Sequence, residues 1–165
     1  MTVTEPSADI TPANTPTQPP VRTRALIVGT GFSGLGMAIA LQRRGIDFLM
    51  LEKADDIGGT WRDNTYPGCA CDIPSHLYSF SFEPKADWRH LFSYQDEIQE
   101  YLQGVTAKYG LRRYIHFDSL VDRAHWDDTE HRWHVFTADG REYIAQFLLL
   151  FHLDFIDNLT IYFNL

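Results

Sequence analysis

The sequence has little basic charge and no long apolar segment, and each shortage excludes a class of protein. Its 165 residues, enough for about one domain, hold 14 Lys and Arg against 22 Asp and Glu, a net charge of −8. Nucleic-acid phosphates call for a concentrated excess of basic residues, whereas pairs such as Arg43-Arg44 are scattered. The longest uncharged apolar run, 143–153, is shorter than the ~20 residues that a membrane helix needs. We expect a small-molecule cofactor as partner, no nucleic acid and no membrane; the oligomeric state stays open.

Cysteine is also scarce, and it does not combine with histidine into a recognisable metal site. Cys69 and Cys71 are the only cysteines, and a single intervening residue is a poor spacing for an unstrained disulfide. None of the seven histidines pairs with them at a spacing known for zinc ligands. His125, His131 and His134 alternate with polar residues around a turn, which favours a solvated ribbon. We predict no metal and interpret the cysteines as structural or incidental.

The first 22 residues differ in composition from the rest of the chain. They contain five of the eight prolines and five threonines, with almost no large apolar side chains. Such a segment cannot bury enough surface to offset the entropy of ordering, so residues 1–22 are predicted to form a disordered tail. No apolar stretch follows a basic start, which argues against a secretory signal. We expect a cytoplasmic location.

A dinucleotide-binding pattern begins directly after this segment. The run Ala25–Val28 is typical of a buried parallel strand, and the glycine-rich turn Gly29–Gly34 follows it. A helical pattern then continues to Gly45, and a second apolar run is closed by Glu52. The order of strand, glycine turn, helix, strand and acid is that of a dinucleotide-binding unit.

Each glycine of this turn, and the acid, has a physical role in such a unit. Gly29 permits the tight turn, Gly31 lets the backbone approach a pyrophosphate, and Gly34 allows the helix to pack closely on the strand. The helix N-terminus offers free N–H groups to the phosphates. Glu52 would bind ribose hydroxyls and repel a 2′-phosphate, which disfavours NADP and leaves FAD or NAD. Two alternatives stay open: glycines that serve only a packed turn, and a site for another adenosine ligand, as in a methyltransferase.

A second block, 57–82, narrows the choice of nucleotide ligand. Periodicity alone indicates only a loop-rich, aromatic segment near the nucleotide site. Its Gly-Gly-Thr-Trp at 58–61, Tyr-Pro-Gly at 66–68 and Cys-Asp at 71–72, taken with the glycine turn, resemble the N-terminal FAD-binding segment of flavin-dependent monooxygenases. The resemblance is to the Baeyer–Villiger type and its flavin-containing monooxygenase relatives, and it runs from about Arg24 to Leu150. It implies FAD in this segment and NADPH in a second module.

The resemblance also assigns expected roles to single positions. Ser33 and the three glycines would lie at the FAD pyrophosphate, Glu52 at the adenosine ribose, and Val121 would contact the adenine through its backbone. The residues expected on the flavin side of the cofactor, near the isoalloxazine ring or beside the nicotinamide pocket, are Thr60, Trp61, Arg62, Asp63, Ala70, Cys71, Asp72 and Tyr78.

Two of these residues have a second interpretation. In the family resembled, the acid that corresponds to Asp72 helps to hold a catalytic Arg from farther along the chain, which makes Asp72 an auxiliary catalytic candidate. Asp72 could equally cap a helix or turn ahead of Pro74. Trp61 could be a large core residue whose indole N–H meets a backbone acceptor.

The remaining pattern predicts one helix and a series of strands. The helix is capped by Ser93, ends before Gly110 and carries its apolar residues on one face. Strands are expected at 113–117, 120–126, 133–137 and 141–144, of which the last three form a β-meander, and a buried parallel strand is expected at 146–151. The fold class is therefore α/β: an incomplete, Rossmann-like, three-layer FAD-binding domain made of a parallel sheet, helices and a β-meander.

The resemblance ends after residue 150. The family continues with an Ala-Thr-Gly turn, a fingerprint motif and a second glycine-rich module, and residues 151–165 match none of these. This favours a truncation or a shifted reading frame, with a tail (1–22), an FAD-binding domain (23–150) and a non-family C-terminal tail (151–165). The NADPH module and the catalytic Arg region are then missing, so whether the chain is an enzyme stays open.

Three functions are compatible with these observations. The first is the FAD-binding portion of an NAD(P)H-dependent monooxygenase that performs Baeyer–Villiger or N/S-oxygenation of a small organic substrate and does not turn over alone. The second is an inactive or partner-dependent FAD-binding fragment. The third, an NAD-dependent dehydrogenase fragment, is disfavoured by the Gly-Gly-Thr-Trp block.

Overall fold

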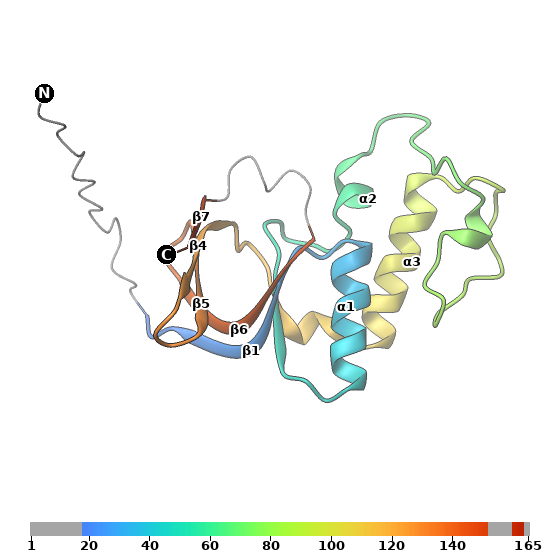
Figure 1. Cartoon of the computed structure of the whole chain (residues 1–165). Helices are drawn as coiled ribbons and strands as arrows, with labels where there is room; N and C mark the ends of the chain where they lie inside the picture. The colour runs from blue at the N-terminus through green and yellow to red at the C-terminus, as the bar shows by residue number, and fades with distance from the viewer. Residues whose placement is uncertain (1–17, 152–159, 164–165) are drawn as a thin grey trace, which may run out of the picture.

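A computed structural model describes residues 18–151 and, as backbone only, 160–163. Its elements are β1 (Val21–Val28), α1 (Phe32–Arg43), β2 (Phe48–Leu51), α2 (Thr60–Asp63), η1 (Ser75–Leu77), α3 (Gln95–Lys108), η2 (Leu111–Tyr114), β3 (Ile115–His116), β4 (Val121–Asp127), β5 (Arg132–Thr137), β6 (Glu142–Leu150) and β7 (Thr160–Phe163). Helices gather at one end of the molecule and β4 and β5 lie at the other (Figure 1). None of the helices in the described part is long and apolar enough to cross a membrane.

The two predicted tails fall largely outside the described residues. The structure does not describe residues 1–17, 152–159 and 164–165. Val21 and Arg22, which the sequence places at the end of the N-terminal tail, pair with β6 at the start of β1. Within the expected C-terminal tail, β7 pairs with β4 in parallel.

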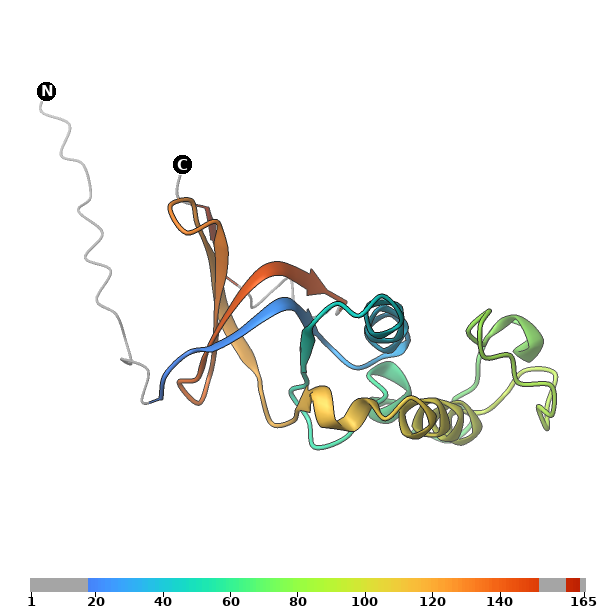
Figure 2. The same ribbon diagram turned by 90° about the horizontal axis from the view of Figure 1, so that it is seen from below.

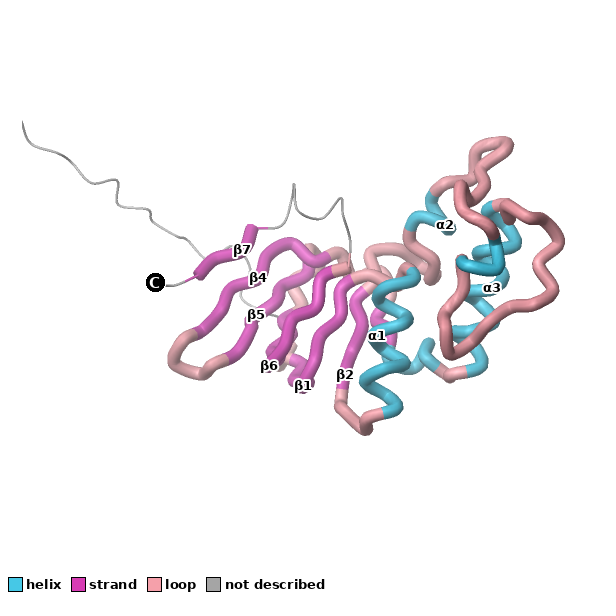
Figure 3. The backbone as a smooth tube through the Cα atoms, turned by 45° about the vertical axis from the view of Figure 1, so that its right-hand side comes forward, coloured by secondary structure: helices cyan, strands magenta, loops and turns pink. Residues whose placement is uncertain are grey.

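The described strands form one mixed sheet in the order β3-β2-β1-β6-β5-β4-β7. The strands β3, β2, β1 and β6 run parallel to one another, as the strand-turn-helix-strand pattern predicts. The strands β6, β5 and β4 are antiparallel and form the expected meander. Figure 3 shows β4, β5, β6, β1 and β2 side by side, with α1 beyond β2.

Alternating side chains of β1 build two cores, which confirms the three-layer arrangement. Ala25 and Ile27 belong to a cluster with residues of α1 and α3. Leu26 and Val28 point the other way, into a cluster with residues of β4, β5 and β6. The parallel strands therefore lie between a helical layer and the meander, as is also visible from below in Figure 2, where α1 and α3 are seen nearly end-on.

Two predictions about the later elements are wrong. The strands expected at 141–144 and 146–151 are one continuous strand, β6, because its two edges serve different partners: residues 142–145 pair with β5 and residues 143–150 with β1. Ser93 does not cap α3, since its buried hydroxyl lies 2.7 Å from that of Ser75 and Tyr94 takes the N-cap position. Of the three histidines of the expected ribbon, His131 is exposed, and His125 and His134 are partly exposed; the last two stack at 4.9 Å, and His134 Nδ1 lies 2.7 Å from Glu142 Oε1.

Candidate functional site

The first glycine turn, Gly29–Gly34, joins β1 to α1 with very little space between them. A Cβ on Gly34 would lie 2.0 Å from the carbonyl oxygen of Gly29, so the predicted packing role of Gly34 is confirmed. A Cβ on Gly31 would meet nothing closer than 3.9 Å. Gly31 is the N-cap of α1, with no side-chain cap and no acidic residue in the first turn. The helix thus presents its first backbone amides, which have no acceptor within the helix, beside the exposed Ser33.

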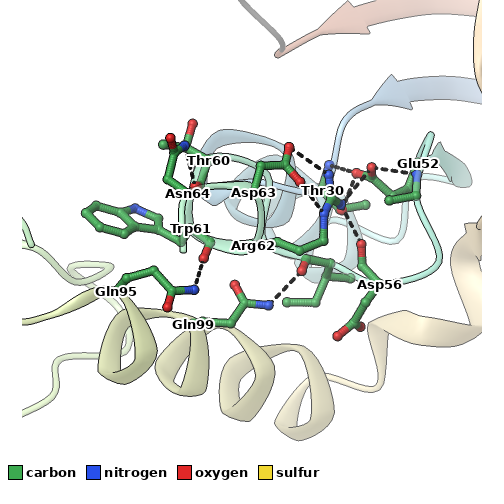
Figure 4. Close-up of polar contacts among 12 residues, drawn as sticks. Thr30, Glu52, Asp56, Thr60, Trp61, Arg62, Asp63, Asn64, Gln95 and Gln99 are labelled. Atoms are coloured by element: carbon green, nitrogen blue, oxygen red, sulfur yellow. Dashed lines mark hydrogen bonds and ion pairs between the residues drawn. The ribbon is translucent and has the colours of Figure 1, made fainter. Parts of the chain in front are cut away.

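Glu52, at the end of β2, is almost fully buried and accepts four hydrogen bonds. Its Oε2 accepts from the backbone amide of Thr30 (3.0 Å) and from the hydroxyl of the same residue (2.5 Å). Its Oε1 accepts from the amide of Ala54 (3.0 Å) and from Nη1 of Arg62 (2.8 Å). Figure 4 shows Thr30 and Arg62 converging on this carboxylate. A carboxylate offers about four lone-pair sites, so all of them are engaged within the protein.

Arg62 lies at Glu52, whereas the resemblance places it on the flavin side of the cofactor. Its guanidinium also donates to both carboxylate oxygens of Asp63 and to the carbonyl of Asp56. Burial acts to lower the pKa of Arg62, but the hydrogen bonds and negative charges of Asp63 and Glu52 outweigh it, so its pKa lies above the ordinary value. Arg62 thus offsets negative charge of Glu52, the charge on which the expected repulsion of a 2′-phosphate depends.

The second glycine turn, Gly58–Gly59, is held between the first turn and α3. The amide of Gly58 donates to the carbonyl of Thr30 (3.1 Å), and a Cβ on Gly59 would lie 3.2 Å from the Cα of Gly31. From the other side, Gln99 of α3 donates to the carbonyl of Ile57 (2.8 Å). The two turns are therefore packed backbone against backbone. The short helix α2 begins here with the exposed Thr60.

Trp61 is a core residue with a polar contact to a predicted site residue. Its side chain packs in the helical core, and its indole N–H donates to the hydroxyl of Tyr78 at 2.9 Å, not to a backbone acceptor. Gln95 of α3 donates to the carbonyl of Trp61. Burial raises the pKa of Tyr78, and the nearby Asp72 carboxylate acts in the same direction.

The segment 69–72 runs alongside the start of α3. Cys71 donates its amide to the carbonyl of Ser93, and Ala70 bridges to Tyr94. Both Cys69 and Cys71 are buried in the helical core, while Ala70 and Asp72 are exposed. The capping interpretation of Asp72 is wrong: η1 has Pro74 at its N-cap position, with no side-chain cap. Among the described residues, no hydrogen bond reaches the Asp72 carboxylate.

Val121 lies close to Glu52 in the fold. The amide of Ser119 donates to the carbonyl of Glu52 at 2.8 Å, which brings the start of β4 to the end of β2. Val121 is buried in the same cluster as Leu51. The structure thus gathers the two glycine turns, Glu52 and Val121 at the carboxyl ends of β1 and β2, where ligands bind in open α/β sheets.

Known proteins share this arrangement. Residues 27–95 match the family model described as an NAD(P)-binding Rossmann-like domain. A Baeyer–Villiger monooxygenase of Streptomyces coelicolor is 53% identical over 118 residues, or 71% of this chain. The chain is a relative of the Baeyer–Villiger monooxygenases. An FAD-binding monooxygenase of Aspergillus niger is 44% identical over 119 residues, again 71% of the chain. The structure of an oxidized steroid monooxygenase bound to NADP superimposes with a TM-score of 0.76 and 36% identity over 79% of the chain.

The chain corresponds to only part of each Baeyer–Villiger monooxygenase or related protein that it matches. It spans 23% of the S. coelicolor protein, 20% of the A. niger protein and 26% of the steroid monooxygenase. The described part of this chain is α/β in fold.

Sequence reasoning missed three residues that hold this candidate site together. Thr30 occupies a variable position of the glycine pattern, and nothing in the pattern marks its contact with Glu52. Gln95 and Gln99 stand one helical turn apart on α3 and both reach the second turn. Their spacing places them on one face. That face could have been recognised as polar, but not as the one that meets residues 57–61.

Proposed function

We propose that this chain is the FAD-binding portion of an NAD(P)H-dependent monooxygenase of the Baeyer–Villiger type. The similarity to the S. coelicolor and A. niger proteins supports the reaction class and FAD. A small organic substrate undergoing Baeyer–Villiger or N/S-oxygenation is the proposed target of the whole protein. The chain by itself is proposed not to turn over NADPH, since its sequence has no second glycine fingerprint.

The first backbone amides of α1 carry this proposal. They lie beside Gly31, which has no side chain that could obstruct a pyrophosphate. With no acidic residue in the first turn, the positive end of the helix dipole is uncompensated there. The fit to a dinucleotide diphosphate is therefore good, and Ser33, whose side chain is exposed, would lie next to it.

The adenosine ribose can bind Glu52 if one of the present donors to its carboxylate is displaced. Four hydrogen bonds already fill the carboxylate, so ribose hydroxyls must replace or share one of them. Arg62 is the donor able to yield, because its guanidinium has alternative acceptors in Asp63 and in the carbonyl of Asp56. The ribose would then bind Oε1 of Glu52.

The flavin end is formed by the residues around Trp61. Bound FAD would supply the reaction with O₂ and the oxygenation of the substrate. Trp61 and Tyr78, which are hydrogen-bonded to each other, would form a fixed wall beside it. Asp72 is exposed and free of hydrogen bonds to the described residues, so its carboxylate is available to position a cationic partner. We propose that the partner is an Arg that belongs to the whole monooxygenase and not to these 165 residues.

Binding of FAD by the purified full chain tests the proposal. Added FAD should remain with the protein through gel filtration, with the visible spectrum of bound flavin. Gly31→Ala should weaken FAD binding by roughly ten- to a hundredfold, the equivalent of the ~1–3 kcal/mol typical of overpacking. Its unfolding midpoint in urea should stay unchanged, because the new Cβ has 3.9 Å of clearance.

Gly104→Ala is the matched control, since its Cβ would meet nothing within 4 Å and the residue lies on α3. It should bind FAD like the unmodified chain. Retention of FAD by Gly31→Ala at the original affinity would place the diphosphate elsewhere. A colourless protein that does not hold added FAD would contradict the proposed cofactor.

A further inference from the structure

The hydroxyl of Thr30 has a role in the nucleotide site that the glycine pattern does not include. We propose that Thr30 is a positioning residue, which fixes the Glu52 carboxylate in the orientation that receives the two hydroxyls of the adenosine ribose. This inference rests on the proposed function, in which Glu52 binds that ribose.

Thr30 binds one oxygen of Glu52 with two donors from a single residue. Its backbone amide and its hydroxyl both donate to Oε2, at 3.0 and 2.5 Å. The side chain is completely buried, and Glu52 is 3% exposed, so neither partner has water as an alternative. Hydrogen bonds to a charged acceptor are stronger than neutral ones and gain further where water is excluded.

The two carboxylate oxygens of Glu52 have different donors, and this difference explains why the Thr30 hydroxyl matters. Oε1 depends on Ala54 and on Arg62, and Arg62 has other acceptors. Oε2 depends on Thr30 alone. If a ribose displaces Arg62 from Oε1, the two bonds from Thr30 keep the carboxylate from rotating with it. A β-branched side chain suits this task, because few χ1 rotamers are open to it.

Thr30 also connects the ribose end of the nucleotide site to the second glycine turn. Its carbonyl accepts the amide of Gly58 in the second glycine turn. Thr30 therefore holds Glu52 through its amide and hydroxyl, and it holds the second glycine turn through its carbonyl. Both contacts originate from one position in the first turn, so the spacing between the two ends of the nucleotide is set there.

The test measures how well the chain distinguishes ADP from 2′,3′-dideoxy-ADP, which lacks both ribose hydroxyls. Calorimetric titrations of the full chain should show a preference for ADP of roughly tenfold or more, as for hydrogen bonds to a charged group. Thr30→Val keeps the shape and the amide but removes the hydroxyl. It should reduce this preference to about twofold or less, and weaken FAD binding in parallel. Thr30→Ser, which retains a hydroxyl, should restore the preference.

Thr137→Val is the matched control. Thr137 is also a buried threonine whose hydroxyl donates to a carboxylate, that of Asp139, at 2.5 Å, but it lies in the meander. The variant loses a hydroxyl–carboxylate bond of the same length, although to a more exposed carboxylate, and should keep the original ADP preference. This separates a positioning effect from a general loss of stability, which urea unfolding of each variant records.

The outcomes separate the inference from the function on which it rests. A folded Thr30→Val that keeps the original preference would overturn the positioning role, while FAD binding by the unmodified chain would leave the proposed function intact. If Thr30→Val does not fold, Thr30→Ala takes its place with the same expectation. Loss of the preference in Thr30→Ser as well would assign the effect to packing and also overturn the proposal. An unmodified chain that binds neither FAD nor ADP would contradict the proposed function itself.

Discussion

The two glycine turns of this molecule look alike in sequence and serve different purposes. In the first turn, the Gly29 carbonyl leaves no space for a side chain on Gly34, whereas a Cβ on Gly31 would lie in ordinary van der Waals contact, 3.9 Å from Gly58 and Gly59. In the second turn, both glycines face the protein: Gly58 lies against the side chain of Gln99, and Gly59 against the backbone of Gly31. The first turn therefore has one glycine, Gly31, at which a Cβ would fit, and the second turn has none.

This difference teaches that glycine spacing does not distinguish a ligand contact from a packing contact. Gly31 and Gly34 both match the dinucleotide pattern, yet a Cβ would fit without a clash only at Gly31. The distinction lies in the environment of each missing Cβ, which the fold determines. A glycine-to-alanine substitution adds only a Cβ. Its effect on the free energy of unfolding should therefore differ from one glycine to another.

Gly34→Ala should have the largest effect. Its Cβ would lie 2.0 Å from the oxygen and 3.0 Å from the carbon of the Gly29 carbonyl, and a backbone group at a strand end cannot move without displacing β1. We expect a loss of about 3 kcal/mol or more in the free energy of unfolding, at the upper end for overpacking. Urea denaturation followed by circular dichroism measures it. A variant as stable as the unmodified chain would mean that α1 and β1 are not packed as described.

Gly58→Ala should be the next in size. The new Cβ would lie 2.1 Å from Gln99 Oε1, and the residue has φ +126°, which L side chains rarely adopt. The side-chain amide of Gln99 can move away, but the backbone strain remains, so we expect a loss of about 2 kcal/mol. The same urea experiment on Gly58→Ala with Gln99→Ala separates the two causes. If the double variant is as stable as Gln99→Ala alone, the backbone strain contributes nothing.

Much of the fold could be predicted because its elements are marked locally. The apolar run of β1, the helical spacing of α1 and the alternation in β4 and β5 each reflect a local requirement. The errors arose where one segment serves two partners. The sequence of residues 141–151 does not indicate that β6 continues from the meander into the parallel sheet. A strand of the meander and a strand of the parallel sheet both carry apolar side chains here, and only the edges that pair differ.

The site could be predicted for its backbone parts and less well for its side chains. The glycines and Glu52 are specified by turn geometry and by the end of a strand, so their neighbourhood follows from the order of elements. The direction of a long side chain does not. Arg62 follows Trp61 directly in the sequence, yet it reaches Glu52 while Trp61 packs toward Tyr78, because consecutive residues of a helix point to different sides.

Gly104→Ala should have the smallest effect and the opposite sign. The residue lies inside α3, exposed, with nothing within 4 Å of an added Cβ. Alanine is favoured over glycine in a helix interior by about 1 kcal/mol, so the urea midpoint should rise slightly. Since the chemical change is identical to that in Gly34→Ala, the difference between the two variants measures the contact with Gly29 alone. A decrease in stability for Gly104→Ala would show that the exposed face of α3 is covered by something that an added methyl group disturbs.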